Sequence, residues 1–358
     1  MLWLGRGVLA LLVLAFSLLF VAAKGISARG ISLSTSTVRR VDSTDSTTPI
    51  VRHDGAVLVI ATTGEHSAQN PALSPDGKTL FFTRYLHGYD ATLGPGGGLL
   101  KRTVPGGRIS ALYDHDEATN VNGLASWNGP TNRIAFAVST GNGDIATIDA
   151  QGKEFLQVTN AGPNNTYLEP TYSPDGKFLV FEDDQPNVSD QFNRADIVWA
   201  PASGGSVKVL VNGRVTATDN RLPVWAPDGS KILFQRRVDL NTDVYNLYTI
   251  RPDGSGLHKI THGDNCDSDA SWSSNGKWIA DSACFSGFGP TPHSNIFLVS
   301  SDGTRVIRAT CDIDHEDGAP TISPDGRWLY FESHRTSDDG SPTQIWRINF
   351  PSRSVSCT

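Results

Sequence analysis

Histidine and acidic residues stand at fixed distances from a short repeated motif, and these residue types can bind metal ions or transfer protons. Counting eight residues back from each copy of the motif reaches a polar residue in all six copies, including His66 and His315. Counting four residues back reaches Asn70, Glu169 and Asp269 in three of them. Neutral imidazole with carboxylate suits a divalent ion, and histidine transfers protons near neutral pH. Such side chains also cap loop backbones, so both roles stay open.

The motif is Ser-Pro-Asp-Gly followed by a hydrophobic run, and it organises the chain. It starts at residues 74, 173 and 323, with degenerate copies at 128, 226 and 273. Proline fixes φ and glycine takes a positive φ, so each copy predicts a tight turn between two strands. A spacing of 45 to 54 residues, with room for four strands, is typical of a β-propeller. We therefore predict an all-β, six-bladed β-propeller over residues 56–358.

The last repeat lacks a fourth strand, because the chain ends after the third. Residues 57–61 precede the first motif and match the missing fourth strand. We therefore predict a ring closed by an N-terminal strand that completes the last blade. Such closure hides two sheet edges that would otherwise invite aggregation.

Composition excludes several classes of protein. The chain has 358 residues, 38% of them hydrophobic, and a formal net charge of −7, which is unlike a coiled coil or a disordered acidic protein. It has no long run of Lys and Arg, and phosphate binding needs a concentrated basic surface. We expect a globular monomer whose partners do not include nucleic acid.

The N-terminal region has the features of an export signal and a linker. A largely apolar run ends at small residues near position 23, and as a helix it would span roughly 24 Å, short of the roughly 30 Å hydrocarbon core. We predict a signal peptide over residues 1–23, with an uncleaved N-terminal anchor as the alternative. The Ser/Thr-rich segment 24–55 cannot form a core and is predicted to be a linker. The protein is then secreted or periplasmic, with no stable membrane span after cleavage.

Four cysteines in an exported chain allow two disulfides. Opposing residues in an antiparallel hairpin have numbers that add to a constant, and Cys266 and Cys284 are centred on the turn of the fifth repeat. We predict that they pair across this hairpin. By elimination Cys311 pairs with Cys357, near the closure of the ring. Four free thiols in a reducing compartment are the alternative.

The same reasoning predicts a cluster of histidines. His315 and His334 are centred on the sixth turn, and His66 and His87 are centred on the first. The first and sixth blades are neighbours in a closed ring, so these imidazoles could converge beside Asp317. This interpretation gives a divalent metal site for Ca, Mn or Zn, with His66, His315 and His334 as ligands, although the spacing lacks the short fixed motif of a zinc site.

The repeats, with their Ser-Pro-Asp-Gly turns followed by Leu-Phe-Phe, Leu-Val-Phe or Leu-Tyr-Phe, resemble those of the TolB-type six-bladed propellers. Similar propellers form the non-catalytic half of prolyl-oligopeptidase-like enzymes. The resemblance covers roughly residues 56–358 and leaves no room for the α/β domain of TolB or for a hydrolase domain. There is also no Gly-x-Ser-x-Gly nucleophile motif, so serine peptidase activity is not expected. The resemblance implies a fold more than a function.

Two functions fit the sequence, and a purely structural envelope protein without a ligand is a third interpretation. The first function is an exported, non-catalytic propeller that binds an envelope or extracellular protein or a glycan through its acidic, His-rich loop face. The alternative is a metal-assisted polysaccharide lyase or hydrolase, which the resemblance permits because some propeller lyases carry histidine-rich metal sites at the channel mouth. The candidate ligand-binding residues are His66, Asn70, His87, Glu169, Arg221, Asp269, His315, Asp317 and His334.

Overall fold

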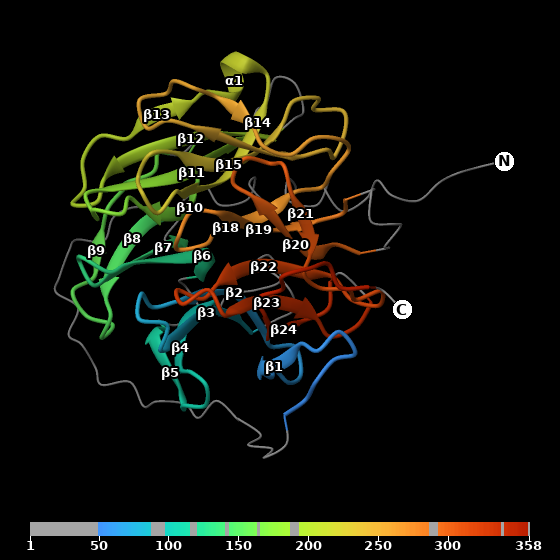
Figure 1. The fold of residues 1–358 in the computed structure, drawn as a ribbon. Helices are drawn as coiled ribbons and strands as arrows, with labels where there is room; N and C mark the ends of the chain where they lie inside the picture. The colour runs from blue at the N-terminus through green and yellow to red at the C-terminus, as the bar shows by residue number, and fades with distance from the viewer. Residues whose placement is uncertain are drawn as a thin grey trace. The chain divides into compact units, whose positions relative to one another are not determined.

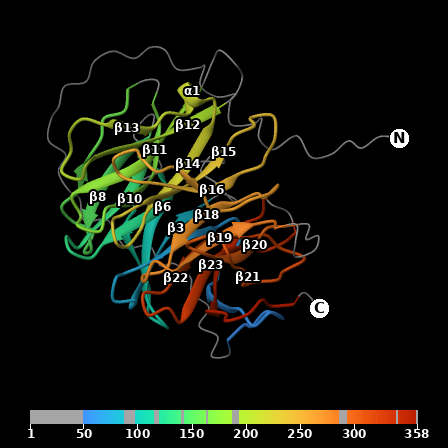
Figure 2. The ribbon, with the colours of Figure 1, turned by 45° about the horizontal axis from the view of Figure 1, so that its top comes forward.

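The strands of the chain form six antiparallel sheets that follow one another around a ring. The computed structural model describes residues 49–86, 97–114, 120–139, 143–162, 165–186, 193–285, 293–337 and 340–356. Each sheet has four strands, and Figures 1 and 2 show the sheets arranged in chain order. The prediction of an all-β, six-bladed propeller is confirmed.

Within each repeat the strands follow one another from the channel outward. Blade one contains β2 (Ser67–Leu73), β3 (Thr79–Tyr85), β4 (Gly98–Thr103) and β5 (Ile109–Tyr113). Blade two contains β6 (Asn120–Asn128), β7 (Arg133–Ser139), β8 (Asp144–Asp149) and β9 (Leu156–Gln157). Blade three contains β10 (Tyr167–Tyr172), β11 (Phe178–Pro186), β12 (Asn193–Pro201) and β13 (Lys208–Val211).

A single short helix, α1 (Gly213–Thr216), stands between the third and fourth blades in the described part of the chain. Blade four contains β14 (Asp219–Trp225), β15 (Ile232–Arg237), β16 (Asn246–Ile250) and β17 (His258–Lys259). Blade five contains β18 (Ser268–Trp272), β19 (Trp278–Ala283), β20 (Asn295–Ser300) and β21 (Val306–Arg308). Blade six contains β22 (Asp317–Ile322), β23 (Trp328–His334), β24 (Thr343–Asn349) and β1 (Val57–Ile60).

The repeated motif forms the turn between the first two strands of a blade. In blade one, the Ser74 hydroxyl donates to Asp76 Oδ1 at 2.6 Å, and the Lys78 N–H donates to the same oxygen at 3.0 Å. Gly77 has a φ of 68°, a left-handed conformation in which a side chain is strained. The turn is therefore held by its own side chains, which explains why the motif recurs with so little change.

The core lies between neighbouring blades and is built from equivalent residues. Eight residues after the start of each motif, five blades carry a phenylalanine that is at most 2% exposed: Phe82, Phe136, Phe181, Phe234 and Phe331. Burying a side chain of this size contributes about 1.5 to 3 kcal/mol. Blade five instead carries Asp281, whose side chain is fully buried. This buried acid is the clearest exception to the repeat.

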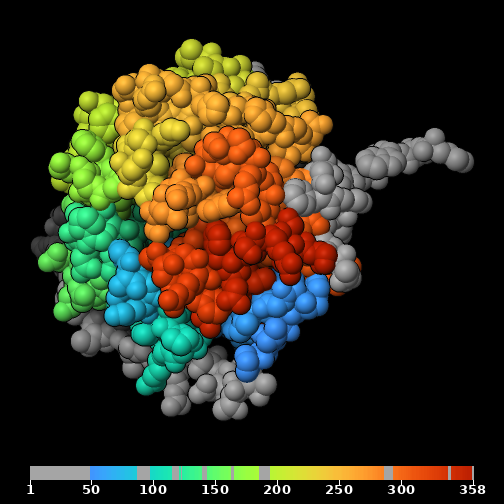
Figure 3. All heavy atoms as spheres, viewed as in Figure 1, coloured from blue at the N-terminus to red at the C-terminus, as the bar shows by residue number. Residues whose placement is uncertain are grey.

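The ring is closed by pairing between the two ends of the propeller. Strand β1 pairs antiparallel with β24, as Figure 1 shows, so the predicted N-terminal closure is confirmed. In Figure 3 the blue segment that carries β1 lies against the red segment of blade six. Just before β1, Arg52 reaches the carboxylates of Asp54, Asp312 and Asp317 at 2.5, 3.3 and 2.7 Å. The closure thus combines a strand with a buried ionic cluster.

The cysteine prediction is confirmed where the structure describes it. Cys266 and Cys284 form a disulfide across blade five, with their Cα atoms 5.5 Å apart. Cys311 is disulfide-bonded as well. Its expected partner, Cys357, lies outside the described residues, although Val355 nearby donates its N–H to the Arg308 carbonyl in blade five.

The N-terminal predictions fall on residues that the structure does not describe. The signal peptide at 1–23 and nearly all of the linker at 24–55 lie outside the described ranges. Within those ranges no helix has the length and hydrophobicity of a transmembrane span.

Candidate functional site

The central channel is lined by the first strand of every blade, and these six strands contact one another in a closed ring. Each first strand contains a bulge, where the pairing with the second strand shifts register. One residue at each bulge has a left-handed φ between 43° and 67°, and these residues are Asn70, Gly123, Glu169, Leu222, Asp269 and Ala319. A bulge removes residues from the sheet ladder, so polar backbone groups there need other partners.

Two glutamates of second strands satisfy bulge N–H groups of the next blade. Glu332 Oε2 in blade six accepts from the Asn70 N–H in blade one at 2.7 Å. Glu182 Oε2 in blade three accepts from the Leu222 N–H in blade four at 3.0 Å. Glu332 and Glu182 are only 5% and 3% exposed, so both carboxylates are enclosed by the inner strands.

Two acidic residues at the bulges themselves, Glu169 and Asp269, also accept hydrogen bonds from N–H groups of a neighbouring blade. Glu169 in blade three reaches back to blade two, where its Oε2 accepts from the Leu124 N–H at 2.8 Å. Asp269 in blade five accepts a hydrogen bond from the Ala319 N–H in blade six. Glu169 keeps a small area open to the channel, although protein surrounds it on all sides. The channel therefore contains four carboxyl groups, each bonded to a neighbouring blade.

These carboxyl groups are close enough to affect one another's protonation. Burial, together with the charges of Glu182, Asp269 and Glu332, raises the pKa of Glu169 to about 8 against the opposing hydrogen bond from the Leu124 N–H. Burial also raises the pKa of Glu182 to about 7, although the positive charge of Arg221 lowers it. Burial raises the pKa of Asp269 as well. The group therefore holds protons near neutral pH and would release them to solvent when a cation binds.

Of the predicted site residues, Asn70, Glu169 and Asp269 occupy equivalent bulge positions in the channel. Glu169 and Asp269 belong to the group of four carboxyls, whereas Asn70 contributes its backbone N–H. Glu169 and Asp269 therefore cap backbone N–H groups and also lie in the channel. Such a group attracts cations and can give up a proton as a cation binds, so it suits binding of an ammonium or guanidinium group.

Arg221 is held within a network of acids beside the channel group. Its guanidinium lies 3.0 Å from Asp219, 3.2 Å from Asp184 and 3.5 Å from Glu182. Tyr245 donates its hydroxyl to Asp219 Oδ2 at 2.5 Å. Arg221 therefore neutralises local acids, and its side chain is not directed at open solvent as a free anion-binding group.

The predicted histidine cluster is placed differently from the expectation. His66 is exposed, whereas His334 is only 6% exposed and its Nδ1 lies 2.8 Å from the Ser341 carbonyl. His334 lies opposite Glu316 in the hairpin, to whose carbonyl its N–H donates, so His315 is one residue out of register. A slip of one residue in a strand places a side chain on the opposite face. His87 lies outside the described residues.

Asp312 and Asp317 serve the ring closure. Asp317 is fully buried and bonded to Arg52, which corrects its assignment to the ligand-binding face. His315 Nδ1 lies 3.0 Å from Asp312 Oδ1. Among the residues that the structure describes, no group of three or more His, Cys, Asp or Glu side chains is placed to hold a metal ion. The predicted ligands His66, His315 and His334 therefore do not assemble into such a group.

Glu182 and Glu332 were missed as candidates, although the sequence carries a signal for them. Both stand nine residues after the start of a motif, directly after the core phenylalanine, as Phe181-Glu182 and Phe331-Glu332. Counting forward from the motif as well as backward would have found them. A glutamate at the end of an apolar strand is otherwise easily taken for a surface residue.

Gly123 allows Glu169 to approach blade two, and this contact can be tested. A Cβ at this position would overlap the Glu169 carboxylate, and the φ of 67° is strained for any side chain. We expect Gly123→Ala to lower the free energy of unfolding by about 2 kcal/mol in chemical denaturation. Gly106→Ala is the control, because nothing lies within 4 Å of a Cβ there. Equal effects of the two substitutions would show that this contact is unimportant.

No protein-family model matches the chain. Among curated proteins, a TolB homolog from Chlorobium luteolum is 31% identical over 204 residues, which is 57% of this chain and 41% of that protein. The chain spans less than half the length of the curated relatives that it matches.

Among solved structures, TolB from Acinetobacter baumannii superimposes with a TM-score of 0.55 at 15% identity, covering 79% of this chain and 66% of that one. The chain is a TolB-like six-bladed β-propeller. The TolB-like propeller also superimposes on an oligogalacturonate lyase in complex with manganese, with a TM-score of 0.54 at 13% identity, covering 85% of this chain and 96% of that one. At these identities both likenesses concern the fold alone.

Proposed function

We propose that the TolB-like propeller is an exported, non-catalytic binding platform that receives a basic segment of an envelope or extracellular protein at the mouth of its central channel. The observation that carries this proposal is the group of Glu169, Glu182, Asp269 and Glu332 within the channel. Buried carboxyl groups that repel one another are stabilised by an incoming cation. A lysine, an arginine or an amino terminus supplies that charge.

Export of the chain is part of the proposal. The disulfide between Cys266 and Cys284 supports it, because disulfides persist in oxidising compartments. Residues 1–23 are proposed to direct export, and residues 24–55 are proposed to connect this segment to the propeller at 56–358.

Binding to the channel is tested with a short lysine-rich peptide as the probe. We expect Glu169→Gln with Asp269→Asn and Glu332→Gln to weaken binding at least tenfold in fluorescence anisotropy, because three of the four acids can no longer ionise when the cation binds. The control removes three exposed acids instead, through Glu154→Gln, Asp175→Asn and Asp325→Asn, so both variants carry the same net charge. Asparagine already occupies the equivalent turn position at Asn275, where it accepts from Lys277 as the acids do.

The pH dependence gives a second readout of the same site. Because burial raises the pKa of Glu169 to about 8, a bound cation must displace its proton at neutral pH. We expect affinity for the peptide to rise between pH 6 and about pH 9 and to level off once the channel group is ionised. Equal weakening by the two triple variants, or affinity that does not change with pH, would contradict the proposal.

The lyase or hydrolase alternative has one specific support, which is the likeness in fold to an oligogalacturonate lyase in complex with manganese. A polyuronate substrate carries many negative charges, and the channel carboxyls would repel it. This argument favours the binding platform. Incubation with pectin and alginate while unsaturated products are monitored distinguishes the two, since product formation would establish the enzyme.

A further inference from the structure

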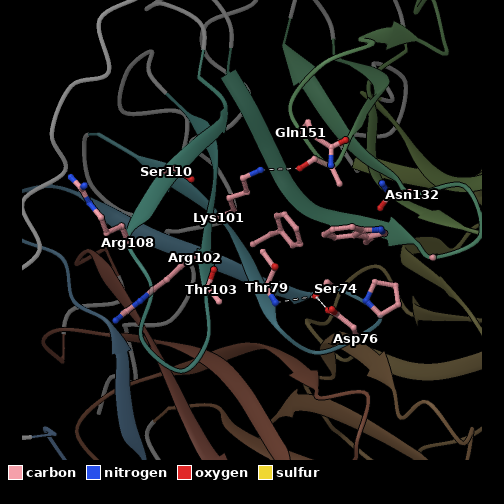
Figure 4. A pocket seen from close by; sticks show the side chains of 15 residues that line it. Ser74, Asp76, Thr79, Lys101, Arg102, Thr103, Arg108, Ser110, Asn132 and Gln151 are labelled. Carbon is pink, nitrogen blue, oxygen red and sulfur yellow. Dashed lines mark hydrogen bonds between the residues drawn. The ribbon is translucent and has the colours of Figure 1, made fainter.

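A cavity of about 560 Å³ opens between blades one and two, and Figure 4 shows the side chains around it. Lys101 and Ser110 come from the outer strands β4 and β5 of blade one. Asn132 and Gln151 come from turns of blade two and lie on the other side of the cavity. The motif turn at Asp76 also lines it, so the cavity lies toward the turn end of the blades, apart from the channel carboxyls.

The residues of blade one explain why this space is open. Lys101 pairs with Phe81 across the sheet and corresponds to Trp199 of blade three, which pairs with Val180. Trp199 fills the junction between blades three and four, where it packs on the core with Trp225. In blade one the same position carries the amine of Lys101 in place of an indole ring, and this amine lines the cavity.

The cavity is lined by basic groups that lack acidic partners. Lys101 Nζ donates to the Ala150 carbonyl at 2.8 Å, and Arg102 Nε donates to the Gly107 carbonyl at 2.9 Å. Arg108 is exposed at the rim. Within the described part of the chain, none of these three side chains forms an ion pair with a carboxylate. Burial also lowers the pKa of Lys101, although the charge of Asp149 opposes this.

The one acid that lines the cavity is engaged by its own turn. Asp76 Oδ1 accepts hydrogen bonds from the Ser74 hydroxyl and the Lys78 N–H within its own turn. The ammonium group of a lysine has three donors, so Lys101 retains two after bonding to Ala150. The side-chain amides of Asn132 and Gln151 also face the cavity without a protein partner in the described ranges.

We propose that this cleft between blades one and two binds an acidic saccharide, with Lys101 and Arg108 on its anionic group and Ser110, Asn132 and Gln151 on its hydroxyl groups. The volume falls within the range of small-molecule sites. Mixed hydroxyl, amide and basic side chains match sugar hydroxyls beside a carboxylate or sulfate.

The experiment is calorimetric titration of the full-length protein with digalacturonate at low ionic strength. Neutral galactobiose tests the need for the charge, and a sulfated disaccharide tests which anionic group is preferred. We expect digalacturonate to bind, galactobiose not to bind, and Lys101→Met with Arg108→Gln to weaken binding at least tenfold. Methionine keeps the unbranched stem of lysine, and thermal unfolding of the variant verifies that it folds.

Matched variants separate this site from the channel and from general surface charge. Lys177→Met removes an exposed lysine of blade three and should leave binding unchanged. Glu169→Gln with Glu332→Gln should also leave saccharide binding unchanged. The cleft proposal can therefore be rejected while the channel proposal stands. Undetectable binding of both acidic disaccharides at about 1 mM, equal binding of galactobiose, or preference for an aspartate-rich peptide would overturn the proposal.

Discussion

Replacing Arg52 with methionine should lower the free energy of unfolding by about 3 to 5 kcal/mol. Arg52 contacts Asp54, Asp312 and Asp317, whose side chains are at most 3% exposed. Its guanidinium also lies over the Phe331 ring, 5.1 Å from the centroid. Without the arginine, three enclosed carboxylates repel one another with no opposing charge, and the strand that closes the ring is released from blade six.

The measurement is chemical denaturation at neutral pH, with Arg327→Met as the control. Arg327 is 79% exposed and lies 3.7 Å from Asp325, so its loss should cost at most about 1 kcal/mol. Comparable losses in the two variants would show that the closure does not depend on the ionic cluster. If Arg52→Met lowers the free energy of unfolding equally at low pH, where the carboxyl groups are protonated, then packing on Phe331 rather than charge explains the effect.

Replacing Asp281 with asparagine should raise the free energy of unfolding at pH 8 by about 2 kcal/mol and leave it nearly unchanged at about pH 3.5. Asp281 is fully buried beside Asp267, which is 1% exposed. Burial raises the pKa of Asp267 to about 6, and it raises the pKa of Asp281 well above its usual range with Asp267 adding to the effect. The two carboxyl groups repel each other when both are ionised, so the folded state favours a proton on at least one of them.

The sign of this effect follows from the direction of both shifts. A carboxyl group with a raised pKa in the folded state contributes full stability below its unfolded pKa and loses it as pH rises through the folded value. The native protein should therefore become less stable as the pH rises from about 4, the ordinary pKa of an unfolded aspartate, to about 8. Asparagine carries no charge and can donate to the Asp267 carboxylate, which removes much of this dependence.

Thermal unfolding at a series of pH values measures the effect, and a change of 2 kcal/mol corresponds to roughly 3 °C in a chain of this size. Asp264→Asn is the control, because its side chain in the same blade is exposed. Parallel pH profiles for the native protein and Asp281→Asn would show that the acid pair does not hold a proton.

The fold could be predicted because its determinants are local. The Ser-Pro-Asp-Gly turn is stabilised by residues within five positions of one another, so each copy specifies a hairpin independently of the rest. The disulfide could be predicted because Cys266 and Cys284 keep the register of Ser268 and Ser282. The spacing of the copies then determines the number of blades.

The site was harder to predict because it depends on contacts between blades. His315 and His334 were expected to face each other. Residues that pair in this hairpin, such as Asp317 and Ser333, have numbers that add to 650, whereas the two histidines add to 649, so they do not pair. Glu182 and Glu332 reach bulges of other blades, and no spacing within one repeat specifies that contact. Arg52 meets Asp317 across 265 positions, which a pattern of short period cannot reveal.

The short connection between β1 and β2 has a further consequence for the way the ring stays closed. Only residues 61–66 separate the two strands, and β1 supplies the outer strand of blade six from the same chain. A tether this short holds β1 near its edge at an effective concentration of millimolar order or above. A free peptide or the corresponding strand of a second molecule must compete with that concentration. The edge of β24 is therefore protected against strand exchange even when β1 dissociates briefly.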